Sequence, residues 1–168
     1  MPEVNRTLSD VGIVFAAYLA PPGPEVIRFT VGQPDFDTPI SVVEAAKDAL
    51  DRGETAYTRT QGSEELCSAV AKHLTIHNIE ADPNDVVITP GCKQAVLYGL
   101  MAALDAGDEV LLLTPAWPSY DGMVRLVGGI PIHVPVKREN YHPDLAALEA
   151  HLTPNTKVII IKSPNNPT

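Results

Sequence analysis

The sequence Val158-Ile159-Ile160-Ile161-Lys162-Ser163-Pro164-Asn165-Asn166-Pro167-Thr168 combines an apolar run with a polar, proline-rich loop. Consecutive β-branched apolar residues are typical of a strand that is buried on both faces of a parallel sheet. In open α/β sheets, ligands bind beyond the carboxyl ends of the strands, which is where this loop falls. Asn166 precedes a proline and is therefore held extended rather than helical. Its side-chain amide can then donate and accept hydrogen bonds to a ligand.

The preceding part of the chain repeats the same pattern. Apolar runs predict four strands, and three helical patterns lie between them; the strands are at 86–89, 109–114, 130–136 and 157–162, and the helices at 92–105, 119–127 and 143–152. Pro143 is expected in the first turn of the last helix, a position that favours proline. Alternation of strands and helices predicts an α/β fold, with a mostly parallel sheet and helix crossovers.

The region before residue 86 is less regular. We expect a short helix over 11–20 and a strand over 25–31. A helix should begin at Ser41 and end at Gly53, and a second should open at Ser63 and run to about Asn78.

Composition restricts the classes of partner. The chain has 168 residues, about one domain's worth, with 45% hydrophobic residues and a formal net charge of −9. Nucleic acid and anionic membranes are bound through basic patches, so neither is an expected partner. Cys67 and Cys92 are too few and too far apart for a disulfide framework. No signal peptide or membrane-spanning run is recognised, and we expect a cytoplasmic protein.

Three groups of residues are candidates for chemistry. Gly91, Cys92 and Lys93 lie where a predicted strand turns into a helix, and the N–H groups of a helix start bind phosphate well. The alternative is an ordinary turn with a solvated lysine. Trp117, the only tryptophan, follows a predicted strand and could stack on a flat ligand or simply cover the sheet edge. His73 and His77 are four residues apart, but apolar neighbours and the lack of a metalloprotease pattern indicate no metal site.

Together these motifs resemble the class I/II aminotransferases, the fold-type I enzymes that use pyridoxal 5'-phosphate (PLP). SPNNPT at 163–168 resembles their signature, and the run at 89–95 resembles the phosphate cup of the bacterial aspartate aminotransferase subgroup. Cys92 departs from the glycine that is typical there, although the backbone donor is kept. The resemblance covers roughly residues 25–168, with the motifs in the family's order.

The resemblance implies roles for particular residues. Gly91, Cys92 and Lys93 would hold the cofactor phosphate, Trp117 would lie against the pyridine ring, and Asn166 would bond the phenolic oxygen. Trp117 and Asn166 would also contact the substrate, whose carboxylate would meet the backbone N–H of Gly32. Tyr57 would reach the phosphate of a neighbouring subunit's cofactor, which implies a homodimer. The peptide bonds before Pro115 and Pro167 are expected to be cis.

The resemblance also implies that the chain carries only part of an active site. In the family, the Schiff-base lysine lies beyond the signature, and none of the six lysines here matches it. We therefore expect an N-terminal half that is inactive alone. Residues 1–40 would form an N-terminal arm and small-domain segment, and 41–168 the first part of the PLP-binding large domain.

The complete enzyme would transfer an amino group between an L-amino acid and a 2-oxo acid. The alternatives are a non-catalytic PLP-type module, as in some transcription regulators, and a PLP-dependent lyase of the same fold.

Overall fold

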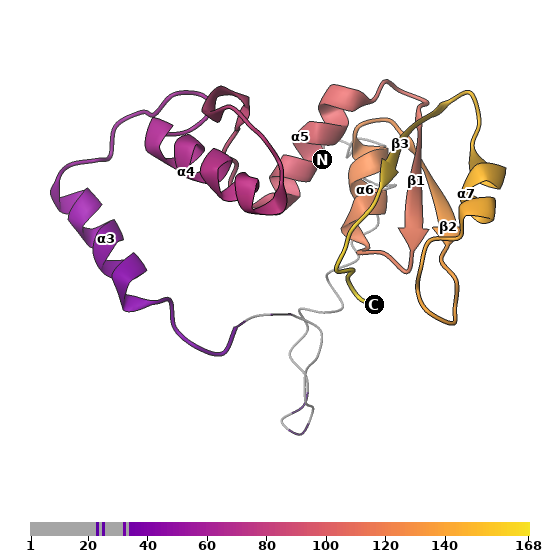
Figure 1. Ribbon diagram of the computed structural model, residues 1–168, viewed down its shortest axis with the longest axis horizontal. Coiled ribbons are helices and arrows are strands. Elements are labelled where there is room, and N and C mark those ends of the chain that lie inside the picture. The colour runs from indigo at the N-terminus through magenta and orange to yellow at the C-terminus, as the bar shows by residue number, and fades with distance from the viewer. Residues whose placement is uncertain (1–22, 24, 26–31, 33) are drawn as a thin grey trace, which may run out of the picture. The chain divides into compact units, whose positions relative to one another are not determined.

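The computed structural model describes Gly23, Glu25, Gly32 and residues 34–168 (Figure 1). These residues belong to two compact units, one that ends at Gly91 and one that comprises Cys92–Thr168. The predicted boundary at residue 40 separates an N-terminal arm and small-domain segment from the large domain. The division into compact units does not test it, so it stays a prediction. The helix expected over 11–20 and the strand expected over 25–31 lie outside the described residues, apart from Glu25.

The Cys92–Thr168 unit is built on a parallel sheet of three strands. The strands are β1 (Glu109–Thr114), β2 (Ile130–Pro135) and β3 (Thr156–Ile160), in the order β2-β1-β3. Leu111 of β1 pairs with Ile132 on one side and with Ile159 on the other. The prediction of an α/β fold with a parallel sheet is therefore confirmed.

Helices cover both faces of this sheet. The strands are connected by α6 (Ser119–Leu126) and α7 (Leu145–His151), and α5 (Cys92–Ala103) precedes β1. β1 is the central strand, with β2 on one side and β3 on the other. The connection from β1 to β2 and the connection from β2 to β3 therefore run in opposite directions across the sheet. Because parallel crossovers are right-handed, α6 and α7 lie on opposite faces, as Figure 1 shows.

The core of this unit lies between the sheet and the helices α5 and α6. Successive residues of β1 point to opposite faces. Val110, Leu111 and Leu112 are each at most 1% exposed, so this strand is buried on both sides. The main cluster consists of Leu100, Leu104, Val110, Leu112, Tyr120, Met123 and Val124.

The unit that ends at Gly91 is smaller and mostly helical. Its elements are α3 (Ile40–Asp51), α4 (Glu64–Leu74) and the 3₁₀ turns η1 (Thr75–His77) and η2 (Pro83–Asp85). Its buried core consists of Cys67, Ala71 and Val86, and α3 buries none of its side chains.

Two expectations about elements were wrong. Residues 86–89 do not form a strand, because no strand lies beside them among the described residues; their contacts are instead with α4 and with Gln61, whose carbonyl accepts from Ile88 N–H at 2.8 Å. Pro143 is not in the first turn of α7. Asp144 is the N-cap, with its carboxylate accepting from the N–H groups of Ala146 and Ala147, so the helix starts after it.

No helix in the described part of the chain combines the length and apolar character needed to cross a membrane.

Candidate functional site

The loops after β1 and β3 carry two of the predicted site residues. The two strands are neighbours and parallel, so their carboxyl ends lie at the same edge of the sheet. Trp117 follows β1 and Asn166 follows β3. The peptide bonds before Pro115 and Pro167 are cis, as expected, and the bond before Pro164 is also cis.

Lys93 and Trp117, predicted separately from two motifs, lie together. The Nζ of Lys93 is 5.1 Å from the centroid of the Trp117 ring, within the range of a cation–π contact. The Trp117 ring also meets Tyr120 edge-on, with centroids 5.5 Å apart and an interplanar angle of 85°. An ammonium group and a half-buried aromatic ring thus lie together.

The turn before α5 is closed by two hydrogen bonds between Thr89 and Gly91. The N–H of Gly91 donates to the carbonyl of Thr89 at 2.7 Å, and the Thr89 hydroxyl donates to the carbonyl of Gly91 at 3.0 Å. Gly91 has φ +90°, and a Cβ there would meet no atom within 4 Å. The space beside the turn is therefore open.

Cys92 is the first residue of α5, and its thiol is exposed. The N–H groups of a helix's first turn have no partner within the helix, so they can bind an anion. Burial raises the pKa of Tyr120, and the nearby Cys92 raises it further. Tyr120 therefore stays a neutral phenol against the ring of Trp117.

Asn166 is exposed, whereas its neighbour Asn165 is half-buried and hydrogen-bonded. The side-chain nitrogen of Asn165 donates to the carbonyl of Pro115 at 2.9 Å and to the hydroxyl of Thr168 at 2.6 Å. Asn165 was not predicted as a site residue. Its sequence position beside Asn166 is the one signal that could have indicated it.

A pocket of ≈480 Å³ opens at the same edge of the sheet. The loops that follow all three strands contribute to its wall, with Ala116, Tyr141, His142, Lys162, Asn165 and Thr168, and α6 adds Tyr120. Trp117 and Asn166 are not among its lining residues, although their neighbours Ala116 and Asn165 are. The two predicted ligand contacts therefore lie outside this pocket.

Gly32 and Tyr57 lie in the unit that ends at Gly91. Gly32 is exposed, a Cβ at its position would have no atom within 4 Å, and Tyr57 is fully exposed. Each is open to a ligand or a partner.

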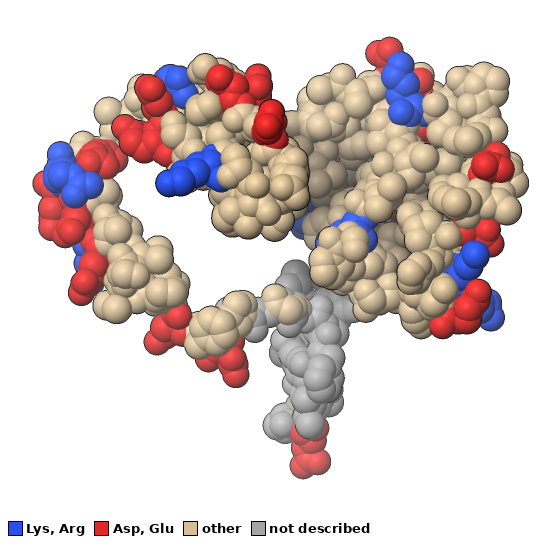
Figure 2. All heavy atoms as spheres, in the orientation of Figure 1, with Lys and Arg blue, Asp and Glu red and all other residues tan. Residues whose placement is uncertain are grey.

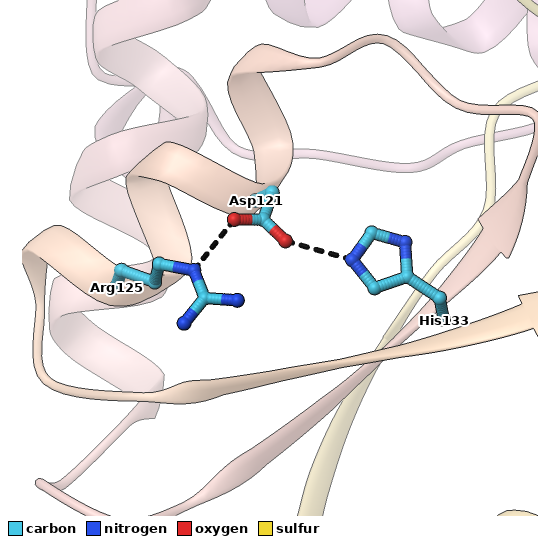
Figure 3. Close-up of polar contacts among 3 residues, drawn as sticks. All are labelled: Asp121, Arg125 and His133. Atoms are coloured by element: carbon cyan, nitrogen blue, oxygen red, sulfur yellow. Dashed lines mark hydrogen bonds and ion pairs between the residues drawn. The ribbon is translucent and has the colours of Figure 1, made fainter. Parts of the chain in front are cut away.

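A polar cluster that the motifs did not indicate links α6 to β2. Figure 3 shows Asp121 between the other two residues: Arg125 Nε lies 2.6 Å from its Oδ1, and His133 Nε2 lies 2.7 Å from its Oδ2. Burial alone would raise the pKa of Asp121, but hydrogen bonds from Arg125 and His133 outweigh it and lower that pKa. The carboxylate is thus held charged where α6 crosses β2.

Charge is spread rather than gathered. Figure 2 shows Lys and Arg side chains scattered among Asp and Glu on the face in view. Among the described residues, no group of three or more His, Cys, Asp or Glu side chains could hold a metal ion. Anion binding would therefore depend on local groups such as Lys93.

A parallel α/β sheet with polar loops at the carboxyl ends of its strands defines a large class of ligand-binding folds. Within that class, this chain belongs to the class I and II aminotransferases, whose family profile matches residues 24–168. The family uses pyridoxal phosphate.

Curated relatives and solved structures agree with this assignment. The chain is 43% identical over 148 residues to the probable aspartate/prephenate aminotransferase of Thermus aquaticus, covering 87% of this chain and 39% of the relative. It is 38% identical over 174 residues to the aspartate aminotransferase of Thermotoga maritima, covering 98% and 46%.

The crystal structure of the Thermotoga maritima aspartate aminotransferase superposes with a TM-score of 0.87 at 39% identity, again covering 98% and 46%. The Thermus thermophilus enzyme with maleate gives 0.80 at 42%, covering 83% and 37%. The fold-type I resemblance is confirmed. The chain spans about two fifths of the length of the curated relatives that it matches.

The residues that surround the turn before α5 fit a phosphorylated aromatic cofactor. The helix start, the open space at Gly91 and the ammonium of Lys93 suit a phosphate, and Trp117 offers an aromatic surface for a flat ring. In this structure the ammonium lies over the ring of Trp117. A ligand that stacked on that face would therefore displace Lys93, and a phosphate nearby would give the displaced ammonium a new partner.

Proposed function

We propose that this chain contributes the cofactor-binding part of a PLP-dependent aminotransferase, which transfers an amino group between an L-amino acid and a 2-oxo acid. The observation that carries the proposal is the 5.1 Å contact of Lys93 with Trp117. Two motifs that the family assigns to the phosphate and to the ring meet in one place. Because the chain belongs to the aminotransferase family, the ligand expected at Lys93 and Trp117 is PLP.

Each residue would have a distinct role. The N–H groups at the start of α5, with Gly91, Cys92 and Lys93, bind the phosphate; Trp117 stacks on the ring; and Asn166 hydrogen-bonds the phenolic oxygen. Pyridoxal phosphate, when bound, withdraws electrons and so makes the Cα–H of an amino acid acidic. Trp117, stacked against the ring, would exclude water from that face and hold the ring in a fixed plane.

The finer parts of the proposal concern substrates and assembly. Gly32 would donate its N–H to the substrate carboxylate, and Trp117 and Asn166 would also contact the substrate. Tyr57, fully exposed here, would bind the phosphate of the partner subunit's cofactor in a homodimer. The relatives' names make aspartate, prephenate and aromatic amino acids the first substrates to test. A cytoplasmic location stays a prediction.

The proposal is tested on the protein purified from its native source. Its intact mass is measured first, for comparison with the 18.0 kDa of this chain. Visible absorbance then reports bound cofactor, and transfer from aspartate to 2-oxoglutarate reports activity. Bound cofactor with stoichiometric amino transfer is the expected result. Release of ammonia without amination of the acceptor would favour a lyase, and protein that never binds PLP would overturn the proposal.

A further inference from the structure

Asn165 links the two loops that carry Trp117 and Asn166. Its side-chain nitrogen donates to the carbonyl of Pro115, 50 residues earlier, at 2.9 Å, and to the hydroxyl of Thr168 at 2.6 Å. A primary amide carries two N–H groups, so one side chain can make both bonds. One bond crosses to the loop after β1, and the other closes the loop after β3 on itself.

Backbone pairing between β1 and β3 does not extend into these two loops. The pairing of β1 with β3 ends at Leu112 and Ile160, so no ladder continues to Trp117 or Asn166. Within the described part of the chain, the bond from Asn165 to Pro115 is the one hydrogen bond that the structure shows between the two loops. Asn165 therefore supplies the hydrogen-bonded link between the two segments that carry Trp117 and Asn166.

Few side chains could replace this amide. Aspartate has the same shape, but when ionised it has no N–H to donate and would place a negative charge against the carbonyl of Pro115. Alanine removes the donor and leaves that carbonyl without this partner. The half-burial of Asn165 limits how easily water could take its place.

We propose that Asn165 is a positioning residue, which holds Trp117 and Asn166 in register for the cofactor without touching it. This inference rests on the proposed function for its catalytic meaning. The link between the loops, however, can be measured without cofactor. Because Trp117 is the only tryptophan, its fluorescence reports on the loop after β1 directly.

The test compares Asn165→Asp and Asn165→Ala with Asn155→Asp. Asn155 is exposed, precedes β3 at the opposite end of the strand, and uses only backbone atoms in its hydrogen bonds. It therefore controls for the change in charge. In the cofactor-free chain, both Asn165 variants should shift the Trp117 emission to longer wavelength and increase its quenching by acrylamide, whereas Asn155→Asp should match the parent.

The second readout is kinetic and uses the active holoenzyme. Misplacement of reacting groups by about 1 Å can cost on the order of 10²-fold in rate, so Asn165→Asp should lower kcat by roughly ten- to a hundredfold with a smaller effect on KM. Asn155→Asp should change neither. If Asn165→Asp does not fold, Asn165→Ala supplies both readouts, since it removes the donor without adding a charge.

The outcomes separate the two proposals. Trp117 emission that is the same in the Asn165 variants and the parent would overturn the inference, whatever the enzyme does. Shifted emission with an unchanged kcat in an active holoenzyme would also overturn it, because the link would then have no positioning role. Shifted emission in a protein that never binds PLP would keep the link between the loops and reject the proposed function.

Discussion

At the scale of the residue, Asp121 makes the stability of the Cys92–Thr168 unit depend on pH. Hydrogen bonds from Arg125 and His133 hold its pKa below the ordinary value of 3.8, despite burial that acts in the other direction. A carboxyl whose pKa is lower in the folded state adds stability above the unfolded pKa. That contribution is lost as the pH falls below 3.8 through the lowered folded-state value.

We therefore expect Asp121→Asn to reduce the free energy of unfolding at pH 6 and to have little effect at pH 2. The loss at pH 6 should stay below about 1 kcal/mol, because the pair is partly exposed and screened. Urea unfolding across this pH range measures it. Asp105→Asn is the matched control, since the structure shows only backbone hydrogen bonds for Asp105. A pH profile identical for the two variants would contradict the role of Asp121.

A second prediction at this scale concerns Gly62. A Cβ at this position would lie 2.7 Å from Cγ1 and 2.9 Å from Cβ of Ile88, and the φ of +117° disfavours any side chain. Gly62→Ala should cost about 2–4 kcal/mol, from overpacking and backbone strain together.

Gly53→Ala is the control for Gly62→Ala. Its φ is also positive, at +75°, but a Cβ there would meet no atom within 4 Å. This variant should cost only the strain, about 1–2 kcal/mol. Both are measured by urea unfolding followed by circular dichroism. Equal losses in the two variants would mean that the contact with Ile88 relaxes at no cost.

At the scale of the element, α4 depends on the residue that caps it. The hydroxyl of Ser63 accepts from the N–H of Leu66 at 3.2 Å, and Glu64 and Glu65 lie in the first turn, where negative charge is favourable. Ser63→Ala should destabilise the unit by about 1 kcal/mol. Ser63→Asp, which keeps an acceptor, should stay close to the parent in thermal unfolding. If both variants lose the same stability, the hydroxyl is not acting as a cap.

Elements whose signals are local were predictable from the sequence, and the others were not. β1 was predicted at its observed bounds because an apolar run lies between polar turns. Residues 86–89 are equally apolar, yet a strand exists only beside a partner, and the sequence does not show which partner is near. The predicted start of α7 was wrong because Pro143 and Asp144 both favour the start of a helix. The capping hydrogen bonds of Asp144 show that the helix begins after Asp144.

At the scale of the whole molecule, the motifs identified the family but not the contacts among site residues. Lys93 and Trp117 were predicted apart, and only the packing of α5 and α6 beside β1 brings them together. Asn165 was missed because its partner Pro115 is distant in sequence. Gly32 and Tyr57 lie in the other compact unit, so their roles stay predictions.

The last prediction is that residues 1–168 alone bind PLP weakly. The groups that they offer are exposed or half-buried. An exposed ion pair contributes below about 1 kcal/mol, and an aromatic contact contributes about 0.5–1.5 kcal/mol beyond its area. Association itself costs at least about 4 kcal/mol, so the Kd should be about 1 mM or higher. The chain spans about two fifths of the length of the relatives that it matches.

Quenching of Trp117 fluorescence by PLP measures this affinity, with pyridoxal, which has no phosphate, as the matched ligand. Weak quenching that is stronger for PLP than for pyridoxal is the expected result, because the helix start and Lys93 favour an anion. Lys93→Met should remove most of that difference. Saturation at micromolar PLP would contradict the prediction, since the groups in this chain would then suffice to hold the cofactor.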